Sequence, residues 1–97
     1  MKLRYSPRAL GDLAAISDYL KSRSSAGARR VEREIRASVS LIEQFPRGGR
    51  ELRRRSGVHV MPVPRLPLLI FYRPTGDELL ILHIRHSARA PFVVDEP

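Results

Sequence analysis

A chain of 97 residues, 42% of them hydrophobic, suffices for one small globular domain and is too apolar for a disordered chain. The absence of cysteine excludes disulfides and thiolate metal sites, and a net charge of +8 at pH 7 favours anionic partners. The chain has neither the roughly 20-residue apolar run of a membrane helix nor the apolar start of a signal peptide. We expect a cytoplasmic domain over residues 1–97 that does not contact membranes, with residues 91–97 as a short tail.

The first predicted elements are a short strand and a helix. Leu3 and Tyr5 alternate with basic neighbours, which is typical of a strand with one apolar face. Ser6 can then cap a helix, and Pro7 suits the first helical position, where no backbone hydrogen bond is lost. Apolar residues at helical spacing continue this helix to Leu20.

A second, longer helix follows after a short polar break. Ser25 is its predicted N-cap, and one apolar face runs from Ala28 to Phe45. Pro46 and the glycine pair at 48–49 end it. Because the break is short, we expect two antiparallel helices. Their apolar faces need a partner surface, which we expect the C-terminal sheet to supply.

The remaining chain predicts three strands, over residues 58–63, 68–73 and 78–85. Pro62 and Pro64 place the first at a sheet edge or at a bulge, because proline cannot donate a ladder hydrogen bond. The other two form a hairpin around a four-residue turn, Pro74 to Asp77. The predicted fold is therefore α+β, in the order β-α-α-β-β-β, with the helical hairpin packed on a small antiparallel sheet.

Basic residues mark the boundaries of this hairpin and form the first candidate site. Strand alternation sends Arg85 and His83 to one face and His86 to the other, so we do not expect the set to converge completely. These residues either contact an anionic target or are solvated strand ends. The candidates for target binding are Arg65, Arg73, Arg85, His86 and Arg89.

A second basic group follows the second helix. It either binds phosphate or an acidic protein segment or is a solvated loop. Gly48 and Gly49 close a helix instead of opening one, so they do not form a phosphate-binding loop. The predicted patch for an anionic partner consists of Arg50, Arg53, Arg54 and Arg55.

Histidine and tyrosine residues suggest no further chemistry. His83 and His86 face opposite sides of a strand, and without cysteine or a nearby carboxylate pair we expect no metal site and no cofactor. His59 is predicted to be a surface strand residue. Tyr72 either packs in the core or stacks on a nucleic-acid base, and the core role is favoured.

Four sequence segments in this order resemble the RelE/ParE superfamily of toxins from type II toxin–antitoxin modules, over roughly residues 2 to 90. They are Tyr5-Ser6-Pro7-Arg8-Ala9 with Asp12-Leu13, Phe45-Pro46-Arg47-Gly48-Gly49-Arg50, Leu68-Leu69-Ile70-Phe71-Tyr72-Arg73, and Ile84-Arg85-His86-Ser87-Ala88-Arg89. The resemblance implies a cognate antitoxin, ParD-like or similar, whose disordered segment would fold across a groove of the toxin.

The superfamily has two branches with different actions. One cleaves mRNA on the ribosome with basic side chains, and the branch named for ParE inhibits DNA gyrase by binding. The cleaving branch typically has lysines on the strand matching residues 58–63, an arginine on the middle strand and often a C-terminal tyrosine. Here Val60, Pro62 and Leu69 lie at or near the strand positions, and the tail has only Phe92. Arg89 matches a basic position common to both branches.

These departures favour a ParE-like toxin that inhibits DNA gyrase by binding and has no catalytic residues. The first alternative is a ribosome-dependent mRNA endonuclease, in which the five target-binding candidates would be catalytic. The second is a non-toxic, basic nucleic-acid-binding module. Direct contact with nucleic acid stays open at this point, although we do not expect the chain to read a DNA sequence.

Overall fold

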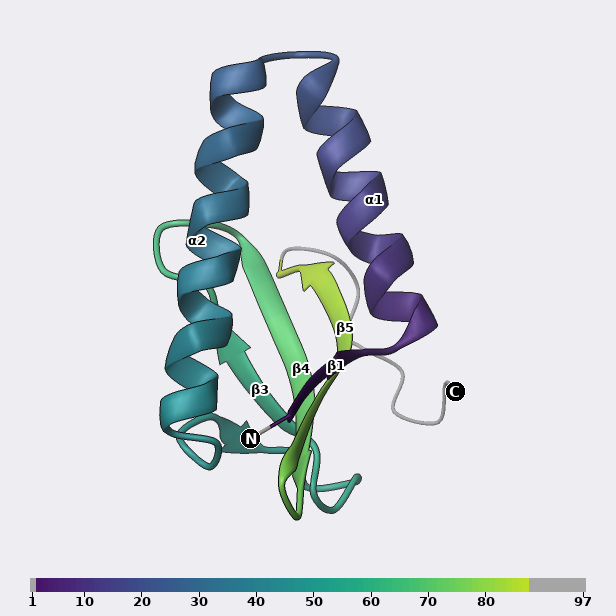
Figure 1. The fold of residues 1–97 in the computed structure, drawn as a ribbon, viewed down its shortest axis with the longest axis vertical. Coiled ribbons are helices and arrows are strands. Elements are labelled where there is room, and N and C mark those ends of the chain that lie inside the picture. Colours follow the sequence, from purple (N-terminus) through teal and green to yellow (C-terminus); the bar gives the residue numbers. More distant parts are fainter. Residues whose placement is uncertain (1, 88–97) are drawn as a thin grey trace.

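The computed structural model describes residues 2–87 as one five-stranded sheet with two helices on one face (Figure 1). The elements are β1 Lys2–Tyr5, α1 Pro7–Lys21, α2 Ser25–Gln44, β2 Arg50–Glu51, β3 His59–Pro62, β4 Leu68–Thr75 and β5 Glu78–His86. The predicted α+β class and element order are confirmed, with β2 as an addition. Neither helix is long and apolar enough to cross a membrane.

The sheet has the strand order β1-β5-β4-β3-β2. All neighbouring pairs are antiparallel except β1 with β5, which is parallel. The strands after the helices therefore form the expected antiparallel sheet, and the N-terminal strand joins it beside the last one. Residues far apart in the sequence thus lie side by side, and β1 leads directly into the helix that covers the rest of β5.

Three details differ from the sequence-based expectations. The strands β4 and β5 pair as far as Thr75 and Glu78, so their turn has two residues and not four. Its first residue, Gly76, has a φ of 54°, which suits glycine. The N-cap of α2 is Ser24, one residue earlier than predicted, and its hydroxyl accepts a hydrogen bond from the Gly27 N–H at 3.0 Å. Phe45 is not on a buried face but is 59% exposed beyond the end of α2.

A bulge in β5 sets which side chains face the helices. Tyr72 pairs with Ile81 and Phe71 with His83, so Leu82 has no partner on β4. Strict alternation from Ile81 would send His83 toward the helices. The extra residue instead turns Ile84 into the core and leaves His83 and Arg85 on the other face.

Two side chains of the α1 region bind at this bulge. The Ser6 hydroxyl caps α1 by accepting from the Ala9 N–H at 3.0 Å, and it donates to the Leu82 carbonyl at 2.8 Å. One carboxylate oxygen of Asp12 accepts from the Ile84 N–H at 2.9 Å and lies 2.6 Å from His83 Nδ1. The helix α1 thereby continues along the edge of β5 beyond the end of β1. Its Asp12 carboxylate satisfies the backbone N–H of Ile84, which β1 does not reach.

The core lies between the helices and one face of the sheet. Ala9 of α1 is fully buried there, and α2 contributes the stripe of Ile35, Val39 and Ile42. This is the stripe that helical periodicity predicts for α2. The sheet contributes Leu68, Ile70, Tyr72, Leu79, Ile81 and Ile84.

Tyr72 also holds the segment that follows α2. Its hydroxyl accepts a hydrogen bond from the Gly49 N–H at 2.9 Å. The predicted core role of Tyr72 is confirmed, but the surface role of His59 is wrong. His59 is 4% exposed, stacks on the Tyr72 ring and places Nδ1 3.0 Å from the Gly49 carbonyl oxygen. It is buried because its pairing with Tyr72 turns it toward the helices.

Two glycines give opposite predictions for substitution by alanine. A Cβ at Gly49 would lie 2.5 Å from the Tyr72 hydroxyl and 2.8 Å from the Val60 carbonyl oxygen, so Gly49→Ala should lower the free energy of unfolding by about 1–3 kcal/mol. A Cβ at Gly11, within α1, would meet nothing within 4 Å. Gly11→Ala should therefore raise the free energy of unfolding by roughly 0.5–1 kcal/mol. Denaturant unfolding measures both, and equal effects would contradict the packing at Gly49.

Candidate functional site

The face of the sheet opposite the helices carries two rows of side chains across β3, β4 and β5. One row is Pro62, Leu69 and Arg85, and the next is Val60, Phe71 and His83. The three positions at which the cleaving branch would typically have basic residues therefore share this face, and all three are apolar. Arg85 and His83 are the ionisable side chains of the two rows.

His83 packs inside the fold and contacts other residues of the chain. It is buried, its ring stacks on Phe71, and its Nδ1 lies 2.6 Å from the Asp12 carboxylate. The sequence suggested neither this pair nor a role for Asp12 beyond the start of the helix. Within residues 2–87, no three His, Asp or Glu side chains come close enough to hold a metal ion.

The target-binding candidates divide between the two ends of the sheet. Arg85 and His86 lie at the end of β5, and Arg65 lies in the β3–β4 loop at the same end. Arg73 shares a face with Arg85 but lies four residues further along β4, about 13 Å at the rise of a strand. The register sends His86 toward the other face, as alternation predicts. Arg89 lies outside the described residues.

The predicted anionic-partner patch lies in β2 and the loop before β3, at the end of the sheet where Arg73 lies. Glu51 accepts a hydrogen bond from the Gly57 N–H at 2.9 Å, and the Leu52 N–H donates to the Val58 carbonyl at 2.8 Å. These bonds fix the loop. Arg50, Arg53 and Arg54 are exposed and Arg55 is half-buried.

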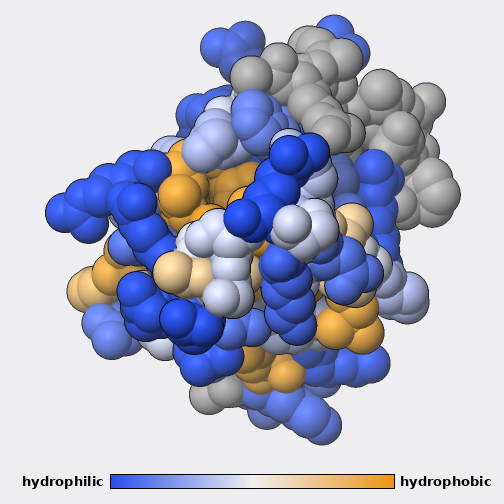
Figure 2. Space-filling model, turned by 90° about the horizontal axis from the view of Figure 1, so that it is seen from above, coloured by the Kyte–Doolittle hydropathy of each residue, from blue (hydrophilic) through white to orange (hydrophobic). Residues whose placement is uncertain are grey.

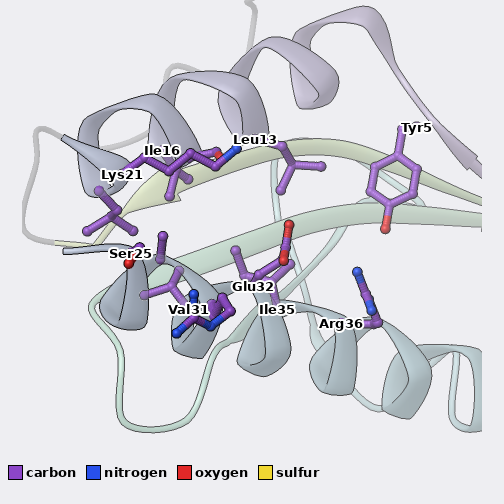
Figure 3. A pocket seen from close by; sticks show the side chains of 13 residues that line it. Tyr5, Leu13, Ile16, Lys21, Ser25, Val31, Glu32, Ile35 and Arg36 are labelled. Atoms are coloured by element: carbon purple, nitrogen blue, oxygen red, sulfur yellow. The ribbon is translucent and has the colours of Figure 1, made fainter. Parts of the chain in front are cut away.

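A groove lies between α1 and α2. Its volume is about 530 Å³. Leu13 and Ile16 of α1 face Val31 and Ile35 of α2 across it (Figure 3). The rim carries Lys21, Arg29, Glu32 and Arg36, so basic residues outnumber acidic ones. Seen from the end of the helical hairpin, hydrophobic surface emerges between hydrophilic side chains (Figure 2).

Residue patterning predicted the two apolar stripes but not the space between them. The stripe of α1 is wider than the sheet can cover, since Leu13, Ile16 and Leu20 all line the groove. An apolar stripe wider than one sheet face can bury is the sequence signal that could have indicated a surface for a partner.

Tyr5 lines one end of this groove. Burial raises the pKa of its hydroxyl, the Glu43 carboxylate raises the pKa further, and the Arg36 guanidinium lowers it. Figure 3 shows the hydroxyl pointing across the groove toward Arg36. The hydroxyl is therefore neutral near pH 7 and can donate a hydrogen bond.

Comparisons with known proteins identify the class. The family model described as the ParE toxin of the type II toxin–antitoxin system, parDE, matches residues 3–91. Toxin RelE2 of Caulobacter vibrioides is 33% identical over 82 residues, which cover 84% of this chain and 90% of the relative. This chain belongs to the ParE toxin family of type II toxin–antitoxin systems.

Solved structures support the same fold. A chain of the chromosomal ParDE system from P. aeruginosa has a TM-score of 0.74 at 27% identity, with 89% of this chain and 95% of that chain covered. The isolated E. coli RelE toxin has a TM-score of 0.61 at 12% identity, with 92% and 86% covered. The likeness to the isolated E. coli RelE toxin is one of fold alone. The RelE/ParE resemblance inferred from the sequence is confirmed.

Tyr72 leads to a prediction at alkaline pH. Burial raises the pKa of its hydroxyl above the usual 10.0, although the Gly49 N–H opposes this. The unfolded chain therefore loses this proton first, and the free energy of unfolding should fall as the pH rises above 10. Tyr72→Phe should show a smaller fall, because the raised pKa of Tyr72 no longer contributes while that of Tyr5 does, and should be about 1 kcal/mol less stable at pH 8. Denaturant unfolding from pH 8 to 11 measures both effects, and identical pH dependence in the two proteins would contradict the assignment.

Proposed function

We propose that this chain stops bacterial growth by binding DNA gyrase and does not cut RNA with its own side chains. The observation that carries the proposal is the composition of the sheet face opposite the helices. Val60, Pro62 and Leu69 lie together on it, and none can donate or accept a proton. The family relatives include proteins named ParE and RelE, so the choice of target rests on these site residues.

The ionisable groups near this apolar surface are poorly suited to proton transfer. Arginine stays protonated at any physiological pH, which makes Arg85 a poor general acid or base. His83 is buried and paired with Asp12. General acid–base groups typically contribute about 10²–10⁴-fold each. A toxin without them would cleave too slowly, whereas a toxin that inhibits by binding does not need them.

The charge distribution supports encounter with a large anionic assembly. Between Glu51 and Asp77 the chain has arginines at 53, 54, 55, 65 and 73 and no acidic residue. Such a one-sided charge speeds association with acidic protein surfaces and with DNA-bound enzymes.

A paired assay tests the choice of target. We expect the purified chain to inhibit DNA supercoiling by gyrase and to leave mRNA intact in a translating extract, because the sheet face supplies contacts and no proton-transfer groups. As a control, a catalytically inactive gyrase incubated with the chain would report binding of the two proteins separately from inhibition of supercoiling. Cleavage of mRNA on translating ribosomes, without an effect on supercoiling, would contradict the proposal and favour the endonuclease alternative.

Membership of a toxin–antitoxin family also implies a cognate antitoxin. We propose that the groove between α1 and α2 receives an amphipathic antitoxin segment. Its apolar side chains would cover Leu13, Ile16 and Val31, and its acidic residues would meet Lys21 and Arg29 on the rim. A helix laid into an apolar groove is a common mode of peptide recognition.

Two alanine substitutions on α2 test the groove. Ala28 lines it, and Ala37 is exposed on the same helix away from it. Ala28→Arg should weaken binding of the purified antitoxin about tenfold or more, because a long charged side chain fills the apolar space. Ala37→Arg introduces the same positively charged residue into the same helix, outside the groove, and this variant should bind the antitoxin as the wild type does. Equal affinities, measured by calorimetry on variants with unchanged circular dichroism, would place the antitoxin elsewhere.

A further inference from the structure

The loop between β3 and β4 contains an unusual backbone conformation. The Leu66 N–H donates to the Val63 carbonyl at 3.2 Å and closes a four-residue turn around Pro64 and Arg65. Arg65 has a φ of 66°, and among residues 2–87 no other non-glycine residue has a positive φ. Proline second and a positive φ third are the pattern of a type II turn, whose third position favours glycine or asparagine. Arginine here occupies a glycine position.

The backbone hydrogen bonds that hold this loop do not involve the Arg65 side chain. This side chain is exposed, and within the described part of the chain it forms no hydrogen bond or ion pair. The loop is held without it, because the Val63 N–H donates to the Leu68 carbonyl at 2.9 Å and the Ser87 N–H to the Pro67 carbonyl at 2.8 Å. A residue that breaks a local backbone rule without an internal compensation indicates a function outside the molecule.

We propose that Arg65 is a preorganised anchor that binds an acidic side chain of the toxin's protein target. The inference rests on the proposed action by binding a protein. A guanidinium forms two parallel hydrogen bonds with a carboxylate, and arginine is enriched among residues that dominate binding at protein interfaces. Pro64 and the closing hydrogen bond hold the backbone in place before contact, so little order is lost on binding.

The surroundings favour a protein over a nucleic acid as the partner. In the loop Arg65 is flanked by the exposed Pro64 and Pro67, which offer apolar contact area beside its charge, whereas Leu66 packs against the core. The other basic side chains described at this end of the sheet are Arg85 and His86. Nucleic-acid sites draw their affinity from several phosphate contacts at once. The arginine run at 53–55 precedes β3, whereas Arg65 follows it, so they lie at opposite ends of that strand.

Glycine and asparagine substitutions separate function from folding, because both suit the positive φ. Arg65→Gly should raise the temperature of unfolding of the purified toxin, since glycine adopts this conformation freely. On expression at equal levels, it should also reduce growth inhibition about tenfold or more, as loss of a dominant contact does. Arg65→Asn should lose inhibition similarly, and Arg65→Lys should retain part of it. Arg33→Gln, on an exposed position of α2, removes one charge elsewhere and serves as the matched control.

Several outcomes would overturn this proposal. These are full growth inhibition by Arg65→Gly, a lowered unfolding temperature, or a wild-type chain that leaves growth unaffected. Inhibition that persists but escapes the antitoxin would assign Arg65 to the antitoxin contact instead. A matching loss of affinity for duplex DNA or RNA would make the partner a nucleic acid. If Arg65→Gly abolishes growth inhibition while gyrase is unaffected by the wild type, the choice of gyrase fails and the anchor stands.

Discussion

The bulge in β5 is the feature on which both surfaces of this protein depend. One unpaired residue, Leu82, shifts the strand so that Ile84 enters the core and Arg85 faces away from the helices. Ser6 and Asp12 bind at this point, through the Leu82 carbonyl and the Ile84 N–H. The start of α1 is thereby fixed to the sheet at the same place where the sheet changes register.

Each side of the sheet acquires its character from this attachment. Because α1 is held at the edge of β5 by its first two turns, its later apolar residues are free to face α2 across the groove (Figure 3). On the opposite face, the shifted register puts Arg85 beside Leu69 and Pro62. The two sides of the molecule therefore differ in chemistry, with an apolar groove and a largely basic rim between the helices and arginines at the ends of the opposite sheet face.

This separation is consistent with a toxin that inhibits by binding. Binding needs well-placed contacts and does not need proton-transfer groups, so basic residues can lie at the two ends of the sheet without meeting in one cleft. The rigid turn around Arg65 and the braced loop before β3 show how such contacts can be held by backbone hydrogen bonds. In both places the backbone is fixed, and Arg53, Arg54 and Arg65 remain exposed.

The sequence by itself determined the elements other than β2, their order and the family. Helical periodicity and the Ser6 cap are local properties, and the four segments quoted for the resemblance are read directly from the chain. Only the tertiary structure decided the bulge, because residues 79–84 are almost wholly apolar and give no signal for a change of face. It also decided the burial of His59, whose face depends on its pairing with Tyr72, and the groove, which depends on how two helices pack on one sheet. These features arise from contacts between residues distant in the chain, which local patterns do not encode.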